Sequence, residues 1–214
     1  MMPFGQPIFV LVGALAFAIL ATTVVTVLTE RRQRSTRCVA LVALPIALLV
    51  VGCAVVSTGL RWNVTASMPI GLYWVTARPH VLTRGMLVAV CAPPVAAKQG
   101  RERGYLGHGP CEDNSEPLLK TIAGVAGDTI TESSDGVRVN GRLLPNSRAL
   151  AADRAGRALT SAPDSRQLLP AGTFWAYADH PRSWDSRYWG AVPSQNVIAQ
   201  MDPVLVVPSI RSAP

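Results

Sequence analysis

The sequence predicts a mainly β domain, a small barrel or a set of folded sheets, preceded by two transmembrane α-helices. Hydrophobic residues make up 49% of the 214 residues and charged residues only 15%, and the apolar excess lies at the N-terminus. After residue 60, short β-branched or apolar segments alternate with turn residues. We therefore divide the chain into a membrane part, residues 1–60, and a β-rich domain, residues 61–214.

Two apolar runs, residues 8–29 and 39–60, contain no charged residue. Each is long enough to cross the hydrocarbon core of a bilayer as a helix. Pro45 lies in the second run, where a lipid-embedded helix accepts a kink more readily than a soluble helix does. Two buried core helices are the alternative, and the absence of charge over this length favours two membrane spans.

The basic residues near the N-terminus lie between the two runs, in residues 30–38, and they are Arg31, Arg32, Arg34 and Arg37. Because cytoplasmic loops are enriched in basic residues, we expect this loop in the cytoplasm and the chain after residue 60 on the outer side of the cell (inner) membrane. A secretory signal peptide would begin with positive charge and have a shorter apolar core. Both runs are therefore predicted to remain as anchors, with the lipid bilayer as a partner.

The charges of the outer domain do not form a recognisable binding pattern. Residues 61–214 hold 16 of the 20 Lys and Arg and 12 of the 13 Asp and Glu, and the basic residues are scattered. Nucleic-acid binding would require basic residues clustered with aromatic ones, so we exclude it. His80, His108 and His180 lack the spacing of metal ligands, and we expect neither a metal nor a cofactor.

The four cysteines fall into two pairs. Cys38 and Cys53 belong to the predicted membrane part. Cys91 and Cys111 lie in the outer domain, where an oxidising compartment permits a disulfide, with two free thiols as the alternative. The residues between them read as a long polar loop, whose base a disulfide would close.

The predicted strands of the outer domain are residues 71–76, 85–92, 118–125, 128–132, 136–144, 173–178 and 202–208. Within 136–144, Asn140-Gly141 is the signal of a type I′ turn between two alternating segments. No part of this domain shows an amphipathic helical period. The polar segment 146–167 is expected to be a hairpin extension or a mobile loop.

Ser67 and Lys120 are the candidate catalytic pair. Only two lysines occur, Lys98 in a charged segment and Lys120 within the apolar sequence PLLKTIAGVAGD. In an apolar pocket the pKa of a lysine falls, and its neutral amine is a competent general base for a serine nucleophile. From these residues alone the signal is weak, and a solvent-facing Lys120 with an incidental linker hydroxyl at Ser67 is the favoured alternative.

Three blocks of sequence carry a resemblance to a known family. "SMP" shortly after the second apolar run, "LLKTIAGVAGD" and "SWDSRYWGAVP" resemble, in order and spacing, the type I signal peptidases. The resemblance covers nearly all of residues 62–203. Within it, "GLYWV", "RGYLGHGPCED" and "VRVNGRLLPNS" look most like the TraF-type peptidases of conjugative transfer, which process pilin precursors.

The resemblance implies a role for each matched residue. Ser67 matches the nucleophile, Lys120 the general base and Ser183 the serine that orients the lysine amine. Thr65 stands where that family often has an oxyanion donor, and Asp185 and Arg187 match a structural pair, the aspartate being implicated in activity in the TraF-type branch. Gly127-Asp128 matches a structural turn.

The expected function is that of a membrane-bound serine endopeptidase that cleaves exported precursor proteins and matures or cyclises a conjugative pilin. A general leader peptidase is the first alternative, and the two apolar runs favour it. The cysteine loop and the short core favour the specialised branch. A non-enzymatic scaffold of a conjugation or secretion complex is the second alternative, and the oligomeric state stays open.

Overall fold

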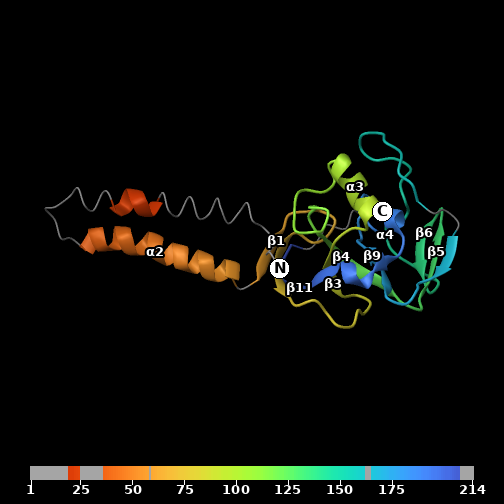
Figure 1. The fold of residues 1–214 in the computed structure, drawn as a ribbon, viewed down its shortest axis with the longest axis horizontal. Coiled ribbons are helices and arrows are strands. Elements are labelled where there is room, and N and C mark those ends of the chain that lie inside the picture. Colours follow the sequence, from red (N-terminus) through yellow and green to blue (C-terminus); the bar gives the residue numbers. More distant parts are fainter. Residues whose placement is uncertain (1–18, 25–35, 58, 162–164, 208–214) are drawn as a thin grey trace. The chain divides into compact units, whose positions relative to one another are not determined.

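The computed structural model describes residues 19–24, 36–57, 59–161 and 165–207, and the chain divides into two compact units, Met1–Leu60 and Arg61–Pro214. In the first unit, residues 19–24 and α2 (Thr36–Ser57) are helical, and Pro45 lies inside α2 (Figure 1). Among the described residues, no helix combines the length and the hydrophobicity that a membrane crossing requires. The run 8–29 lies largely outside the described residues, and the two spans remain predictions.

The second unit is mainly β, as predicted, and contains two antiparallel sheets (Figure 1). The larger sheet has the strand order β1-β2-β11-β3-β4-β9-β10. Its strands are β1 (Leu60–Asn63), β2 (Gly71–Thr76), β3 (Leu87–Val90), β4 (Leu118–Val125), β9 (Thr173–Tyr177), β10 (Val192–Pro193) and β11 (Val197–Val206). β11 thus joins β2 to β3, so that the last strand of the described chain holds the first strands in the sheet.

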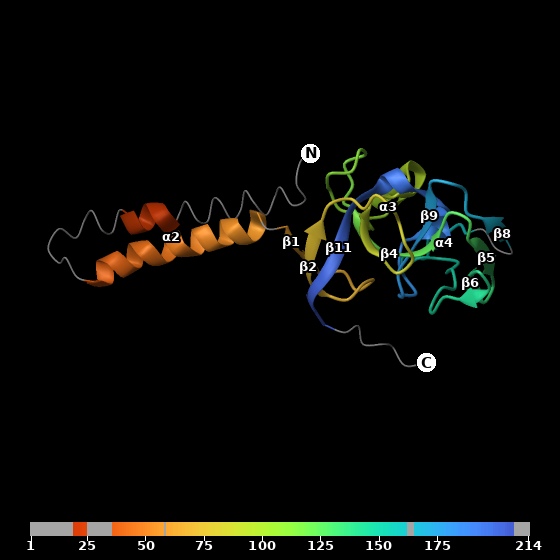
Figure 2. The same ribbon diagram turned by 90° about the horizontal axis from the view of Figure 1, so that it is seen from below.

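The smaller sheet has the order β7-β6-β5-β8 and lies at one end of the domain in both ribbon views (Figures 1 and 2). Its strands are β5 (Thr129–Ser133), β6 (Gly136–Val139), β7 (Arg142–Leu143) and β8 (Ser165–Leu168). Asn140 and Gly141 have φ values of 51° and 83°, which confirms the type I′ turn predicted between β6 and β7. Every predicted strand segment overlaps an observed strand.

The core joins the two sheets through β9, whose residues alternate between two clusters. Phe174 and Ala176 pack with Val88, Val90 and Ile122 inside the larger sheet. Trp175 and Tyr177 pack instead against apolar residues of the smaller sheet, namely Ile130, Val137 and Val139. This period-2 alternation buries both faces of one strand and makes β9 a central element of the domain.

The second unit contains two short helices, although its sequence shows no amphipathic helical period and residues 92–110 read as a polar loop. α3 (Pro94–Glu102) occupies the segment between the two cysteines, and α4 (Ser186–Trp189) is a single turn near the end of the chain (Figure 1). Pro94 opens α3, where its missing N–H costs nothing, and Ala96, Ala97 and Gly100 form the buried face. Nine residues are too few for the helical period to be recognised in the sequence.

The Cys91–Cys111 disulfide is present, with the two Cα atoms 5.8 Å apart, which confirms the predicted pairing over two free thiols. The segment 146–167 ends in β8 and contains an antiparallel bridge between Ala152 and Ala158, which agrees with the expected hairpin extension. Asp153 organises it by accepting hydrogen bonds from Tyr105 Oη and from Arg157 Nε, the latter at 2.7 Å. The connection is therefore attached to the rest of the domain.

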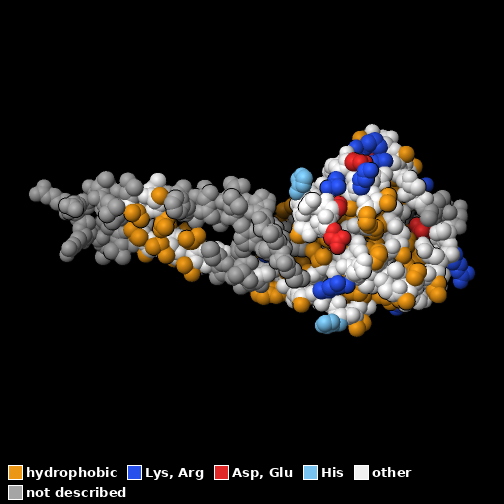
Figure 3. Space-filling view, in the orientation of Figure 1, with side chains coloured by type: hydrophobic (Ala, Val, Ile, Leu, Met, Phe, Trp, Pro, Cys, Tyr) orange, Lys and Arg blue, Asp and Glu red, His pale blue; other side chains and the backbone are white. Residues whose placement is uncertain are grey.

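Figure 3 shows one face of the molecule, on which the visible Lys and Arg side chains lie in separate groups. Hydrophobic and uncharged areas lie between them. Among the residues described on that face, the basic groups do not merge into one continuous surface.

Candidate active site

Lys120 is buried in β4, with only 1% of its surface exposed. It lies on the same face of the strand as the buried Ile122, and its Nζ donates a hydrogen bond of 2.8 Å to Ser183 Oγ. Burial lowers the Lys120 pKa to about 8, and of the two nearby charges Asp185 raises this pKa and Arg187 lowers it. About one lysine in ten is then neutral at pH 7, compared with fewer than one in a thousand for an exposed lysine.

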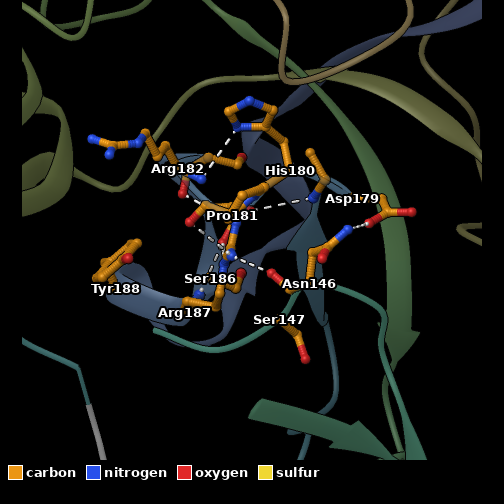
Figure 4. Close-up of polar contacts among 12 residues, drawn as sticks. Asn146, Ser147, Asp179, His180, Pro181, Arg182, Ser186, Arg187 and Tyr188 are labelled. Atoms are coloured by element: carbon orange, nitrogen blue, oxygen red, sulfur yellow. Dashed lines mark hydrogen bonds and ion pairs between the residues drawn. The ribbon is translucent and has the colours of Figure 1, made fainter. Parts of the chain in front are cut away.

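Ser183, the acceptor of the lysine, belongs to the segment between β9 and α4. Its side chain is buried, and its backbone N–H donates to His180 O at 3.0 Å. Arg187 Nη2 donates to the carbonyls of His180 and Ser183, at 2.8 and 3.3 Å (Figure 4). The Arg187 guanidinium therefore holds the backbone that carries the Ser183 hydroxyl.

Asp185 and Arg187 form an ion pair whose side chains are completely buried. Arg187 Nε and Nη2 each donate to the Asp185 carboxylate at 2.8 Å. Asp185 is also the N-cap of α4 and accepts from the Arg187 and Ala178 backbone N–H groups. The pair stabilises the turn behind the lysine. Neither residue is among the described residues that line the pocket beside Ser67.

Ser67 is half-buried and lines a pocket of about 660 Å³. The pocket wall also includes Met68 and Pro69, residues 121–123 of β4 and the β6–β7 hairpin. Ser67 and the strand that carries Lys120 thus border the same space. Among the described residues no hydrogen bond joins Ser67 Oγ to Lys120 Nζ.

Asn63 was missed by the sequence reasoning and organises the backbone around Ser67. Its Nδ2 donates to the carbonyls of Met68 and Pro69, at 3.3 and 3.0 Å, and also to that of Thr65. Its Oδ1 accepts from the Thr65 N–H and from the Thr65 hydroxyl, the latter at 2.7 Å. Asn side chains often hydrogen-bond the backbone two residues further on, so this local turn could have been predicted from Asn63.

Thr65 is exposed, and its hydroxyl hydrogen is engaged with Asn63. To donate to an oxyanion, this hydroxyl would have to rotate away from Asn63 Oδ1. The structure therefore brings Lys120, Ser183, Asp185 and Arg187 into one connected network and gives Thr65 a separate local partner.

Trp184 connects this network to the disulfide loop. Its Nε1 donates to Ala96 O of α3 at 3.2 Å, and its ring packs on Ala92, Ala97 and Leu106. Tyr188 stacks on the same ring at 5.2 Å between centroids. Because Trp184 directly follows Ser183, the packing of α3 also restrains the position of the serine. The described residues contain no cluster of three His, Cys, Asp or Glu side chains that could hold a metal ion.

The chain is also similar in sequence to known proteins. The family model "Signal peptidase, peptidase S26" matches residues 8–206, and the chain belongs to this family. It is 35% identical to the Escherichia coli "Plasmid transfer protein TraF" over 178 residues, which cover 82% of this chain and 98% of that one. It is 34% identical to the "Conjugal transfer protein TraF" of Agrobacterium tumefaciens (strain 15955), over 71% of this chain and 85% of that one.

A more distant relative is the "Signal peptidase I" of Leptolyngbya laminosa. It is 29% identical over 90 residues, which are 40% of this chain and 39% of that one. The chain is thus a signal-peptidase-like protein of the TraF type, as its sequence blocks predicted.

Proposed function

We propose that this chain is a membrane-bound serine endopeptidase in which Ser67 is the nucleophile and Lys120 the general base. The observation that carries the proposal is the buried Lys120, whose pKa is lowered to about 8 and whose amine is held by Ser183. Among the described residues no carboxylate forms an ion pair with Lys120, and burial of its charge costs stability, which supports a role for its neutral amine. Ser67, at the wall of the adjoining pocket, supplies the matching hydroxyl.

In the proposed reaction Ser67 Oγ attacks the scissile carbonyl carbon while Lys120 Nζ takes the hydroxyl proton. The C–N bond then breaks, and the Lys120 ammonium returns the proton to the leaving amine. The Ser67 backbone N–H, and the Thr65 hydroxyl after rotation, are the proposed oxyanion donors. Water resolves the acyl-enzyme to a cleaved product, or an amine resolves it to a ligated or cyclised one.

The proposed substrate is an exported precursor protein, and the similarity to conjugal and plasmid transfer proteins favours a conjugative pilin. The proposed location is the outer face of the cell membrane, with the domain beyond residue 60 extracytoplasmic. This location rests on the two charge-free runs and the four arginines between them. A general leader peptidase would share the chemistry and differ in accepting many precursors.

Two substitutions with a matched control test the peptidase. Ser67→Ala and Lys120→Met should each lower precursor processing by at least about a hundredfold, because each removes a reacting group. Methionine fills the space of the lysine side chain but supplies no basic group. Lys98→Met, at the only other lysine and with a side chain 74% exposed, should leave processing unchanged. Full activity of Ser67→Ala or Lys120→Met in folded protein would contradict the Ser67–Lys120 dyad.

A further inference from the structure

The pocket wall carries charges that the proposed reaction does not use: Arg84, Arg142 and Asp179. We propose that Arg142 binds a carboxylate of the peptide substrate, either an acidic side chain or the C-terminal carboxylate, and thereby selects substrates by charge. This inference rests on the proposed peptidase function, because it concerns the same pocket.

Arg84 already has an anionic partner. Its Nε donates to Asp128 Oδ2 at 2.6 Å and its Nη2 to Oδ1, and the Asp128 side chain is only 5% exposed. These hydrogen bonds hold the Asp128 pKa well below its usual range. Arg84 and Asp128 therefore form a neutral unit, which leaves little attraction for a second carboxylate.

Arg142 has no such partner. It is exposed, begins the edge strand β7 and is paired through the backbone with Val139. Among the described residues no carboxylate or carbonyl accepts a hydrogen bond from its side chain. A guanidinium presents five donors in a planar fork that matches a carboxylate, so this pocket-lining cation is available for a substrate.

The hairpin that carries Arg142 is held in place at its turn. Asn140 Nδ2 donates to Asp128 Oδ1 at 2.8 Å, and Asn140 Oδ1 accepts from the Thr129 N–H at 2.9 Å. Asp128 therefore neutralises Arg84 and also fixes the turn that precedes Arg142. A backbone that is already ordered lowers the entropic cost of binding through Arg142.

Asp179 is the other charge in the wall, and it limits where a carboxylate can bind. Its Oδ1 accepts from Asn146 Nδ2 at 2.7 Å (Figure 4), and within the described residues no ion pair joins it to Arg142. The pocket thus presents a cation and an anion at separate points. A substrate carboxylate is attracted near Arg142 and repelled near Asp179, so the charge preference depends on its position in the substrate.

The test measures peptide binding to the full chain carrying Ser67→Ala, in detergent micelles, by fluorescence anisotropy. The labelled peptides span the precursor cleavage site and carry Glu or Gln at successive positions, each as a free acid and as a C-terminal amide. Arg142→Gln should weaken the binding of peptides with the correctly placed carboxylate about five- to tenfold. It should leave the affinity for the other peptides unchanged. Arg142→Lys should retain part of the preference, and the preference should weaken as salt is added.

Arg166→Gln is the matched control, since Arg166 is an exposed arginine on β8, the opposite edge of the same sheet, outside this pocket lining. Arg166→Gln should leave the affinity for every peptide unchanged. Comparison of Glu peptides with free-acid peptides identifies which carboxylate binds. Equal weakening of all peptides by Arg142→Gln, or no weakening, would overturn the charge selection. Because this binding assay needs no turnover, its result is separate from the processing test of Ser67 and Lys120.

Discussion

Lys120 Nζ donates a 2.8 Å hydrogen bond to Ser183 Oγ in the interior of the domain. The two residues are 63 positions apart in the sequence, and the pairing of β3, β4 and β9 brings the lysine to the turn that carries the serine. Burial lowers the pKa of the amine, and the hydrogen bond to Ser183 fixes its direction. The first prediction separates these two contributions.

Removing the Ser183 hydroxyl should lower kcat and move the pH profile. In the native protein kcat/KM should rise with pH through an apparent pKa near 8, as Lys120 loses its proton. A hydrogen bond accepted from the ammonium favours the charged form, so Ser183→Ala should shift this limb to lower pH. It should also lower kcat about tenfold or more, because the amine loses its orientation. An unchanged limb with unchanged kcat would contradict an orienting role.

Lys120→Met should stabilise the protein at neutral pH while inactivating it. The folded pKa of about 8 lies below the ordinary value of 10.5, so the unfolded chain binds more protons between these pH values. The stability cost of the lysine is complete below about pH 8 and is relieved as the pH rises toward 10.5. It amounts to about 3 kcal/mol at pH 7, which is roughly 6–12 °C in Tm.

Thermal unfolding of the full chain in detergent at pH 7 and at pH 10 measures this difference. The advantage of Lys120→Met should shrink at the higher pH. Lys98→Met is again the control and should match the native protein at both pH values, since its side chain is exposed. A variant less stable than the native protein at pH 7 would show that the lysine is not held at a desolvation cost.

Loss of the Cys91–Cys111 disulfide should destabilise the domain and impair the site. Opening a loop with a sequence separation of 20 residues costs about 3 kcal/mol by loop entropy. It also loosens α3, on which Trp184 docks beside Ser183. Replacing both cysteines by serine should lower Tm and kcat together. The control variant replaces Cys38 and Cys53 by serine. Equal effects of the two double variants would refute the role assigned to the Cys91–Cys111 disulfide.

Arg187→Lys should be strongly destabilising although it keeps the charge. A lysine cannot reproduce the paired hydrogen bonds to Asp185 together with those to the His180 and Ser183 carbonyls. Disrupting a buried ion pair costs about 3–5 kcal/mol, measurable as a loss in Tm. Asp179→Asn, at an exposed carboxylate of the same segment, should have little effect on stability.

The sequence was most informative where the signal is local. The strands and the Asn140-Gly141 turn follow from alternation and turn chemistry, and both were predicted correctly. α3 was missed because its proline start and nine residues resemble a polar loop. Its start signal, Pro94 at the first helical position followed by Val, Ala, Ala, Lys and Gln, was nevertheless readable.

The candidate site was only partly predictable, because only part of it depends on local sequence signals. The resemblance to the signal peptidases pointed to Ser67 and Lys120, but the burial of Lys120 depends on strands that are distant in the sequence. The role of Arg187 in holding two carbonyls depends on the path of the 180–183 turn, which no local pattern encodes. The partner of Thr65, by contrast, was two residues away and could have been found.

The covalent intermediate provides the most direct test of the proposed mechanism. A precursor peptide is mixed with the full-length protein in detergent, quenched in acid within the first turnover, digested and analysed by mass spectrometry. The proposed mechanism predicts a peptide containing Ser67 that carries the mass of the acyl fragment, and no such adduct in Lys120→Met. Cleavage of the precursor with an adduct on another residue, or without any adduct at Ser67 in rapidly quenched samples, would contradict it.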